Sequence, residues 1–371
     1  MANLWILLIM IIVSLATSIL GVFLVLRKMS MQIDAISHTV LLGIVLSFMI
    51  VMDLNSPLLI IGASLMGVLT VFLGELLVKT KKTDEESAIG VIFPLLFSVA
   101  VVIVTLYFSG VHLDIDAVLL GKVELSVFDQ LVINGVKIGP KSFYIILSVF
   151  IINLLFVGVF YKELKLISFD EALAKTLGFM PTLIHYLLMT LISLTAVTSF
   201  NIVGSILVIS LMIAPPATAL LITKDLFKTI MYSLIIGVIN SVLGFFTAIV
   251  IFKGEVTIAG MVSSFSLISF LMVLIFNSKN GVIYTIYKRY HQKFEFSFIV
   301  LMLHIGNHQH LEGEEHEIEE LLIPHELKWS LKKYQKLLHH GFEKKLIYRV
   351  NGKINLTDQG ILFYEDKLKY L

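Results

Sequence analysis

Residues 27–51, RKMSMQIDAISHTVLLGIVLSFMIV, carry two polar side chains inside a long apolar stretch that follows a basic pair. Asp34 and His38 are four residues apart, so an α-helix would bring both to one face. A carboxylate within the hydrocarbon layer costs about 2.5 kcal/mol or more, so a function or a partner must offset it. An oxygen and a nitrogen ligand together suit zinc, manganese and iron. The stretch therefore predicts a membrane helix bearing either a metal site or a polar contact between helices.

The composition is that of an integral membrane protein. Of 371 residues, 57% are hydrophobic and 15% are charged, whereas soluble domains have about 25% charged residues. The absence of cysteine excludes disulfides and thiolate metal sites. Charged residues are absent from 1–26 and frequent near the C-terminus. We therefore expect a transmembrane domain over 1–277, a basic linker over 278–293 and a soluble domain over 294–371.

Apolar runs of about 17 to 25 residues predict the membrane spans. The predicted ranges are 4–26, 32–52, 57–78, 88–108, 142–160, 183–199, 202–221, 226–252 and 257–276. The sixth and seventh runs meet at Phe200-Asn201, so the count is eight or nine. Pro215-Pro216 would break the seventh span or be tolerated as a kink. Basic residues gather in alternate loops, which predicts a multi-pass protein of the cytoplasmic membrane whose C-terminal tail is cytoplasmic.

Residues 162–180, KELKLISFDEALAKTLGFM, differ from an ordinary short loop. Ser168 or Asp170 could cap a helix, apolar residues follow at helical spacing, and Gly178 could end it. This pattern predicts a short helix between two spans. Such a helix could dock on a partner or lie on the lipid headgroups.

Four stretches together resemble the permease subunits of ATP-binding-cassette importers for zinc, manganese or iron. They are 23–48 (FLVLRKMSMQIDAISHTVLLGIVLSF), 87–104 (SAIGVIFPLLFSVAVVIV), 112–123 (HLDIDAVLLGKV) and 168–223, which begins SFDEALAKTLGFMP. The similarity covers residues 1–276 and keeps the order of the family's blocks. It implies an all-α polytopic membrane protein with eight or nine transmembrane helices.

The resemblance also implies functional residues and partners. Asp34 and His38 match a block that contributes to metal binding on the family's transport path. The segment around FDEALAKTLG looks like the coupling element that enters a cleft of the ATPase subunit; the matching residues are Phe169, Asp170, Glu171, Ala174 and Gly178. The implied partners are a cytoplasmic ATPase subunit, an extracellular or periplasmic metal-binding protein, membrane lipid and a second permease copy. This chain departs from the family at Leu42, where proline is common, and carries an insertion around 130–141.

The chain is expected to be a transport subunit rather than an enzyme. No G-x-x-x-x-G-K-[ST] motif occurs, so a separate subunit would hydrolyse ATP. We expect no permanently bound cofactor, only a transported manganese, zinc or iron ion. Two alternatives are a membrane-anchored metal-responsive DNA-binding regulator and a secondary transporter that uses no ATP. The polar residues His185, Asn201 and Asn240 are expected to form hydrogen bonds between helices.

The last seventy-odd residues predict a small α+β domain. Helices are expected at 296–305 (FSFIVLMLHI), at 313–323 (GEEHEIEELLI) and from His325 to Gly341-Phe342. A hairpin should then turn at Asn351-Gly352, and Thr357 should cap a last helix. This order resembles a winged helix-turn-helix, and LTDQG at 356–360 is similar to the wing of diphtheria-toxin-repressor-like metal regulators.

Two uses of this winged-helix-like C-terminal domain compete. Its basic third helix could contact DNA phosphates, or it could meet anionic lipid or the ATPase. The candidate nucleic-acid contacts are Lys328, Lys332, Lys333 and Lys336. A run of histidines among glutamates could also bind metal and sense its supply, or be only a solvated loop. The histidines are His304, His308, His310 and His316.

Overall fold

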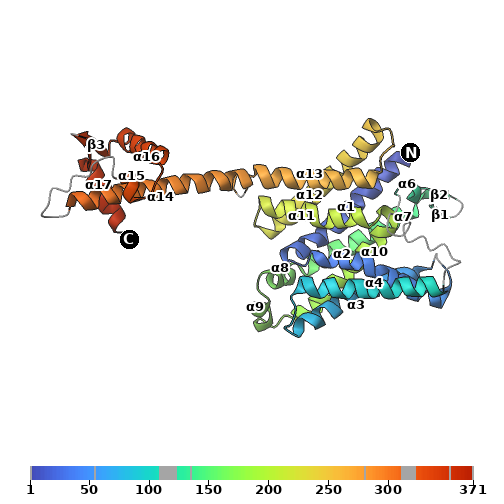
Figure 1. Ribbon diagram of the computed structural model, residues 1–371. Helices are drawn as coiled ribbons and strands as arrows, with labels where there is room; N and C mark the ends of the chain where they lie inside the picture. The colour runs from blue at the N-terminus through green and yellow to red at the C-terminus, as the bar shows by residue number, and fades with distance from the viewer. Residues whose placement is uncertain are drawn as a thin grey trace. The chain divides into compact units, whose positions relative to one another are not determined.

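The computed structural model describes residues 2–53, 56–107, 123–133, 136–279, 281–310, 323–350 and 352–369. Contacts divide the chain into two compact units, Met1–Asn277 and Ser278–Leu371. Each unit has its own hydrophobic core. Figure 1 labels helices and strands of both units.

The first unit is a bundle of membrane helices, which confirms the predicted polytopic helical fold. Within the described residues, 9 helices are long and apolar enough to cross a membrane. They are α1 (Ala2–Leu26), α2 (Met31–Val51), α3 (Pro57–Lys79), α4 (Glu85–Tyr107), α7 (Lys141–Val159), α10 (Pro181–Val203), α11 (Ser205–Ile222), α12 (Leu226–Phe246) with its π-helical extension η1 (Thr247–Ile251), and α13 (Ile258–Phe276).

The sixth and seventh spans are separate helices, but they do not meet at Phe200-Asn201. Helix α10 continues to Val203, and Gly204 joins it to α11 with φ 85° and ψ 157°. Glycine adopts this backbone conformation without the steric cost of a Cβ atom. The chain therefore turns at the first glycine after the predicted junction.

Pro215 and Pro216 are tolerated inside α11, which runs without a break from Ser205 to Ile222. Pro215 has no N–H, so the Leu211 carbonyl loses its normal helical donor. The Ser18 hydroxyl of α1 donates to that carbonyl over 3.2 Å. A hydroxyl from a neighbouring helix thus satisfies the freed backbone group, as membrane interiors require.

Polar contacts and close backbone approaches join the helices of the bundle. Thr70 of α3 donates to Thr39 of α2 over 2.8 Å. A Cβ atom on Gly43 of α2 would lie 2.5 Å from the Gly62 carbonyl oxygen of α3, so a larger residue there would push the two helices apart. Asn240 donates to serines of α13, which confirms its expected role between helices. Asn201, in contrast, is exposed.

The insertion around 130–141 contains an antiparallel hairpin of β1 (Gln130–Ile133) and β2 (Val136–Pro140), preceded by the short helix α6 (Val123–Ser126). Its register shifts between Leu131 and Val132, as is typical of a β-bulge. Gly139 packs against the Trp5 indole, since a Cβ atom there would lie 2.8 Å from the ring. The hairpin therefore rests on the N-terminal end of α1.

The second unit contains α14 (Val282–His310), α15 (Ile323–Glu326), α16 (Leu331–Glu343), strands β3 (Ile347–Val350) and β4 (Lys353–Leu356), and α17 (Asp358–Leu368). Helix α14 includes most of residues 278–293, which were expected to form a linker. The helix expected at 313–323 lies outside the described residues except for its last residue, which begins α15.

The expected third helix begins later than His325. His325 and Glu326 end α15, and Lys328 turns the chain with φ 50°. Ser330 then caps α16, its hydroxyl oxygen accepting the Lys333 N–H over 3.4 Å. The helix also continues past Gly341 to Glu343. Lys328 therefore lies in a turn and not on the basic helix.

The hairpin and last helix follow the sequence pattern. Val350 pairs with Lys353, and Gly352 has φ 79°, as a tight turn between the strands requires. Asn351 lies outside the described residues. The Thr357 side chain accepts the Gly360 N–H over 3.1 Å and thereby caps α17. The core beneath them contains the fully buried side chains of Phe298, Leu301 and Met302 from α14.

Candidate functional site

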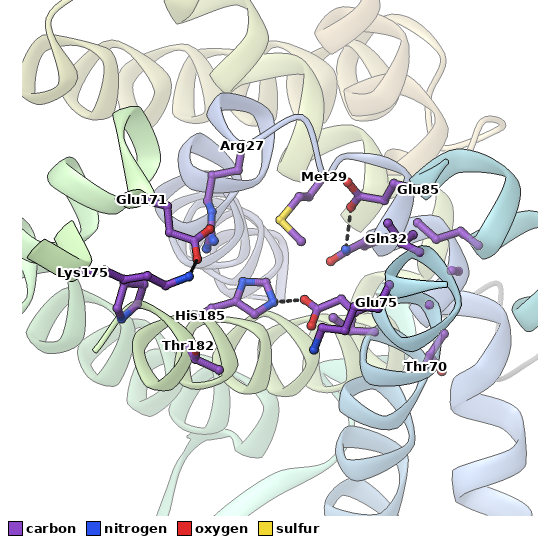
Figure 2. A pocket seen from close by; sticks show the side chains of 17 residues that line it. Arg27, Met29, Gln32, Thr70, Glu75, Glu85, Glu171, Lys175, Thr182 and His185 are labelled. Carbon is purple, nitrogen blue, oxygen red and sulfur yellow. Dashed lines mark hydrogen bonds and ion pairs between the residues drawn. The ribbon is translucent and has the colours of Figure 1, made fainter. Parts of the chain in front are cut away.

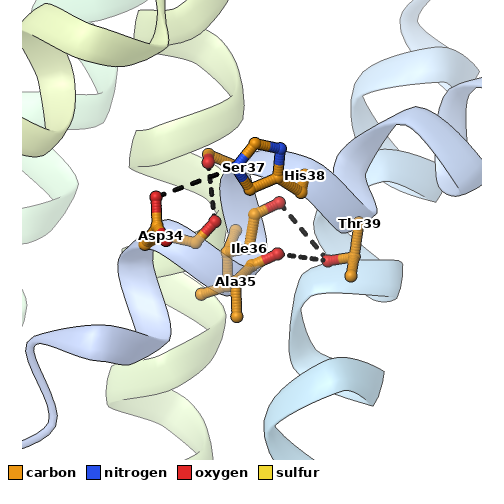
Figure 3. A network of polar contacts seen from close by, with 6 residues as sticks. All are labelled: Asp34, Ala35, Ile36, Ser37, His38 and Thr39. Carbon is orange, nitrogen blue, oxygen red and sulfur yellow. Dashed lines mark hydrogen bonds and ion pairs between the residues drawn. The ribbon is translucent and has the colours of Figure 1, made fainter. Parts of the chain in front are cut away.

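Asp34 and His38 lie on one face of α2, as their spacing predicts (Figure 3). The Asp34 Oδ1 and His38 Nε2 atoms are 3.8 Å apart. Two rings of α4 hold the imidazole: Phe93 stacks on it at 5.4 Å, and Phe97 meets it edge-on at 5.9 Å. The pair thus offers one oxygen ligand from the Asp34 carboxylate and one nitrogen ligand from the His38 imidazole, whose orientation is fixed by packing.

This pair faces outward from its own chain. The His38 and Asp34 side chains are 39% and 45% exposed, although neighbouring Ile33, Ala35 and Ile36 are buried. An ionisable pair on a membrane helix rarely faces lipid because that exposure is costly. The geometry therefore calls for another protein surface or a water-filled space over this face.

The segment expected as one helix between the fifth and sixth spans forms two, α8 (Tyr161–Phe169) and α9 (Glu171–Thr176). Asp170 separates them with extended backbone, and its Oδ1 accepts the Leu173 N–H over 2.9 Å. Asp170, rather than Ser168, is thus the cap. A carboxylate at this position satisfies an unpaired N–H and favours a new helix start.

Gly178 ends α9 as the sequence predicts, with φ 84°. Its N–H donates to the Lys175 carbonyl, and the Phe179 N–H donates to the Ala174 carbonyl, both over 3.1 Å. These two bonds form a Schellman motif, which favours glycine because of its left-handed conformation.

The predicted coupling residues surround α9, but they differ in exposure. Ala174 is fully buried and fixes the helix to the bundle, whereas Phe169 is 61% exposed. Glu171 is exposed and pairs with Lys175 over 2.8 Å. Leu173 and Leu177 are exposed as well. Helices α8 and α9 therefore expose an apolar surface that also carries charged groups.

A polar cavity of about 460 Å³, not predicted from the sequence, lies beside this segment (Figure 2). His185 of α10 forms an ion pair with Glu75 of α3. Tyr186 donates to the other Glu75 oxygen over 2.8 Å, and Gln32 donates to Glu85 over 2.9 Å. His185 thus joins two helices, as expected, but its partner is the Glu75 carboxylate, which was not predicted from the sequence.

Electrostatics connect this polar cavity to α9. Arg27 lines it together with Glu171 and Lys175 of α9. Burial lowers the pKa of the Arg27 guanidinium, while the carboxylates of Glu171, Glu75 and Glu85 oppose that shift. The guanidinium therefore remains positive among three carboxylates from three helices. A movement of α9 would change the field at the ends of α3 and α4.

In the second unit, three predicted lysines line a groove of about 340 Å³. Lys332, Lys333 and Lys336 of α16 lie opposite Lys293 and Tyr290 of α14. Burial lowers the pKa of Lys333, and the like charge of Lys293 adds to the effect. Lys328, in contrast, does not line the groove.

The structure brings two of the four predicted tail histidines together. His304 and His308 lie on α14 with ring centroids 4.8 Å apart, and His304 bonds to Glu326 of α15. The side chain of His310 and the whole of His316 lie outside the described residues.

The chain resembles known transport proteins in sequence and in fold. It matches the ABC 3 transport family over residues 2–277. The manganese transport system membrane protein MntD of Bacillus subtilis (strain 168) is 40% identical over 279 residues, which are 75% of this chain and 93% of MntD. The zinc transport system membrane protein TroD of Treponema pallidum (strain Nichols) is 36% identical over 361 residues, which are 97% of both chains. The similarity to TroD therefore includes the C-terminal unit.

A solved structure supports the same assignment. A chain of PsaBC from Streptococcus pneumoniae in complex with Fab superposes with a TM-score of 0.61 at 29% identity, covering 74% of this chain and 92% of that one. The family match covers the whole helical bundle described above, and MntD aligns over almost its full length. This chain belongs to the ABC 3 transport family.

Proposed function

We propose that this chain is the permease subunit of an ATP-driven importer for a divalent transition metal. The Asp34–His38 pair carries the proposal, because an oxygen and a nitrogen ligand 3.8 Å apart on a membrane helix suit such an ion. Relatives named for manganese and for zinc transport support the same class of substrate. Manganese, zinc and ferrous iron all accept this ligand pair.

A second copy of the chain would complete the site. The outward face of Asp34 and His38 requires a cover other than lipid. A two-fold axis beside α2 would bring two such pairs together and supply two nitrogen and two oxygen ligands. Four ligands in place of two would hold the ion during transfer and release it when the copies move apart.

The energy would come from a separate ATPase subunit that docks on α8 and α9. The exposed apolar side chains of Phe169, Leu173 and Leu177 suit a cleft in such a partner. A displacement of Glu171 would change its electrostatic interaction with Arg27, and Arg27 also interacts with the carboxylates of Glu75 and Glu85 in the polar cavity. The basic loops favour a cytoplasmic location for this end of the bundle and for the C-terminal unit. A binding protein on the opposite side would deliver the metal.

Uptake of radioactive manganese and zinc by cells tests the proposal. Cells without their own importers should accumulate one of the two metals only when this chain and the ATPase subunit proposed as its partner are produced together. An ATPase with a substituted Walker lysine should abolish uptake. Undiminished uptake with that inactive ATPase would contradict an ATP-driven importer and would favour a secondary transporter.

A second candidate function concerns the C-terminal unit. The helix, hairpin and helix order over residues 331–368 resembles a winged helix, and four lysines gather at its groove. We propose that the lysine groove binds a polyanion, with DNA as one such partner. Double-stranded DNA should bind the full chain in nanodiscs, and Lys332→Gln with Lys336→Gln should weaken binding and its salt dependence. Equal DNA affinity in that variant would contradict the role of the groove.

A further inference from the structure

The C-terminal unit contains a cluster of three metal-ligating side chains that is separate from Asp34 and His38. His304 and His308 lie one turn apart on α14, and the His304 Nε2 atom is 2.8 Å from Glu326 Oε2. One ligand atom from each of the three residues lies within 4.8 Å of the others. Ligands of one tetrahedral ion are about 3.4 Å apart, so a small closing movement would suffice.

The surrounding packing holds these ligands in place. Gly306, between the two histidines, packs on the Tyr364 ring, since a Cβ atom there would lie 2.3 Å from it. The Tyr364 hydroxyl also donates to Asn307 over 2.7 Å. On the other element, Ile323 is fully buried and anchors α15. The backbone positions of all three ligands are therefore fixed by the core.

Burial and charge fit a cation site at the edge of this core. The His304 side chain is 18% exposed and that of Glu326 is 46% exposed, so an ion can enter from solvent. Within the described residues, no hydrogen bond or ion pair engages the His308 ring, which leaves its nitrogen free to bind an ion. Two imidazoles and one carboxylate form a ligand set typical of zinc, iron and related ions with one open position.

We propose that His304, His308 and Glu326 bind a divalent transition metal and that this ion ties α14 to α15. The ion would therefore join two elements that lie apart in the sequence. Binding to the folded unit alone would stabilise it in proportion to the metal concentration. The C-terminal unit would then respond to the ion that the permease delivers, a step that rests on the proposed function.

Metal titration of the full-length protein tests the site. The chain should carry Asp34→Asn and His38→Gln, so that the transport pair contributes nothing, and it should be freed of metal in nanodiscs. Calorimetry with Zn²⁺ alone should then detect one ion per chain. His308→Ala and Glu326→Gln should each weaken binding by at least about tenfold. Glu326→Gln keeps a hydrogen-bonding partner for His304, so it separates ligand loss from misfolding.

A matched pair of residues provides the control. His339 and Glu343 lie one turn apart on α16 with 3.2 Å between His339 Nε2 and Glu343 Oε1, and their joint replacement should leave the titration unchanged. Absence of a bound ion would overturn the proposal. A loss of Zn²⁺ affinity in this control equal to that in the His308 and Glu326 variants would overturn it too. Loss that follows His310→Ala with His316→Ala, and not His308→Ala, would overturn it as well. The importer proposal is tested separately, by metal uptake into cells that produce the chain with intact Asp34 and His38.

Discussion

Replacement of His38 by glutamine or of Asp34 by asparagine should reduce metal uptake to the background level. Each change removes one ligand of the pair and keeps a side chain of similar size and polarity, so α2 should still pack against Phe93 and Phe97. Loss of a metal ligand should weaken binding by more than the roughly 10- to 100-fold that changes to supporting residues cause. Initial rates of radioactive manganese or zinc uptake measure the effect.

Ser37→Ala is the matched control for this experiment. Ser37 lies between the two ligands in the sequence, and its hydroxyl donates to the Asp34 backbone carbonyl of its own helix, over 2.6 Å. Uptake in this variant should stay close to that of the parent. All variants should reach the membrane and retain the ATPase at parental levels. Uptake at the parental rate in either ligand variant would eliminate the Asp34–His38 site.

Gly178→Pro should release the ATPase subunit and stop transport. Proline fixes φ near −65°, whereas Gly178 has φ 84° and donates its N–H to Lys175. A substitution that is incompatible with the native backbone lowers the stability of the folded state by more than about 1 kcal/mol. At Gly178 it should disrupt the C-terminal end of α9. Co-purification of the ATPase with the permease measures the loss.

Two further variants separate docking from general damage. Gly90→Ala introduces a methyl group into open space on α4, so it should leave co-purification unchanged. Glu171→Lys removes the bond to Lys175 and places a second cation near Arg27 without changing the backbone. It should also release the ATPase. Full retention of the ATPase by both Gly178→Pro and Glu171→Lys would show that α9 packs on headgroups instead of coupling the subunits.

The helical bundle could be predicted from the sequence because each span is a long apolar run. The Asp34–His38 pair could be predicted for the same reason, since two polar groups four residues apart stand out against that background. Their outward direction could not, because it depends on which neighbours α2 meets. The division of 162–180 into α8 and α9 also depended on a choice between two caps, Ser168 and Asp170.

The polar cavity was missed because the residues that line it come from distant parts of the sequence. Glu75 lies near the end of an apolar run, one turn before Lys79, where a charged residue usually indicates only the edge of the membrane. Its partner His185 follows 110 residues later. The Glu75 carboxylate within the third apolar stretch was the one local sign of a buried polar contact. Its partner His185 becomes evident only from the packing of α3 against α10.

Glu326 was missed in the C-terminal unit for a related reason. The sequence favoured one continuous helix from His325, which would have placed Glu326 on the basic face. Ser330 was the local sign of a later start, because serine is a preferred cap three residues before Lys333. With the helix start moved to Leu331, Glu326 belongs to α15 and can reach His304.

The most direct measurement is pulsed electron paramagnetic resonance of Mn²⁺ bound to the permease and ATPase complex. The chain should carry His304→Ala and His308→Ala, so that no imidazole signal arises from the cluster proposed for the C-terminal unit. We predict a nitrogen coupling from a directly bound imidazole, and its loss when His38→Gln is added. An unchanged nitrogen coupling in the His38→Gln chain, or no such coupling before that change, would contradict a metal path through Asp34 and His38.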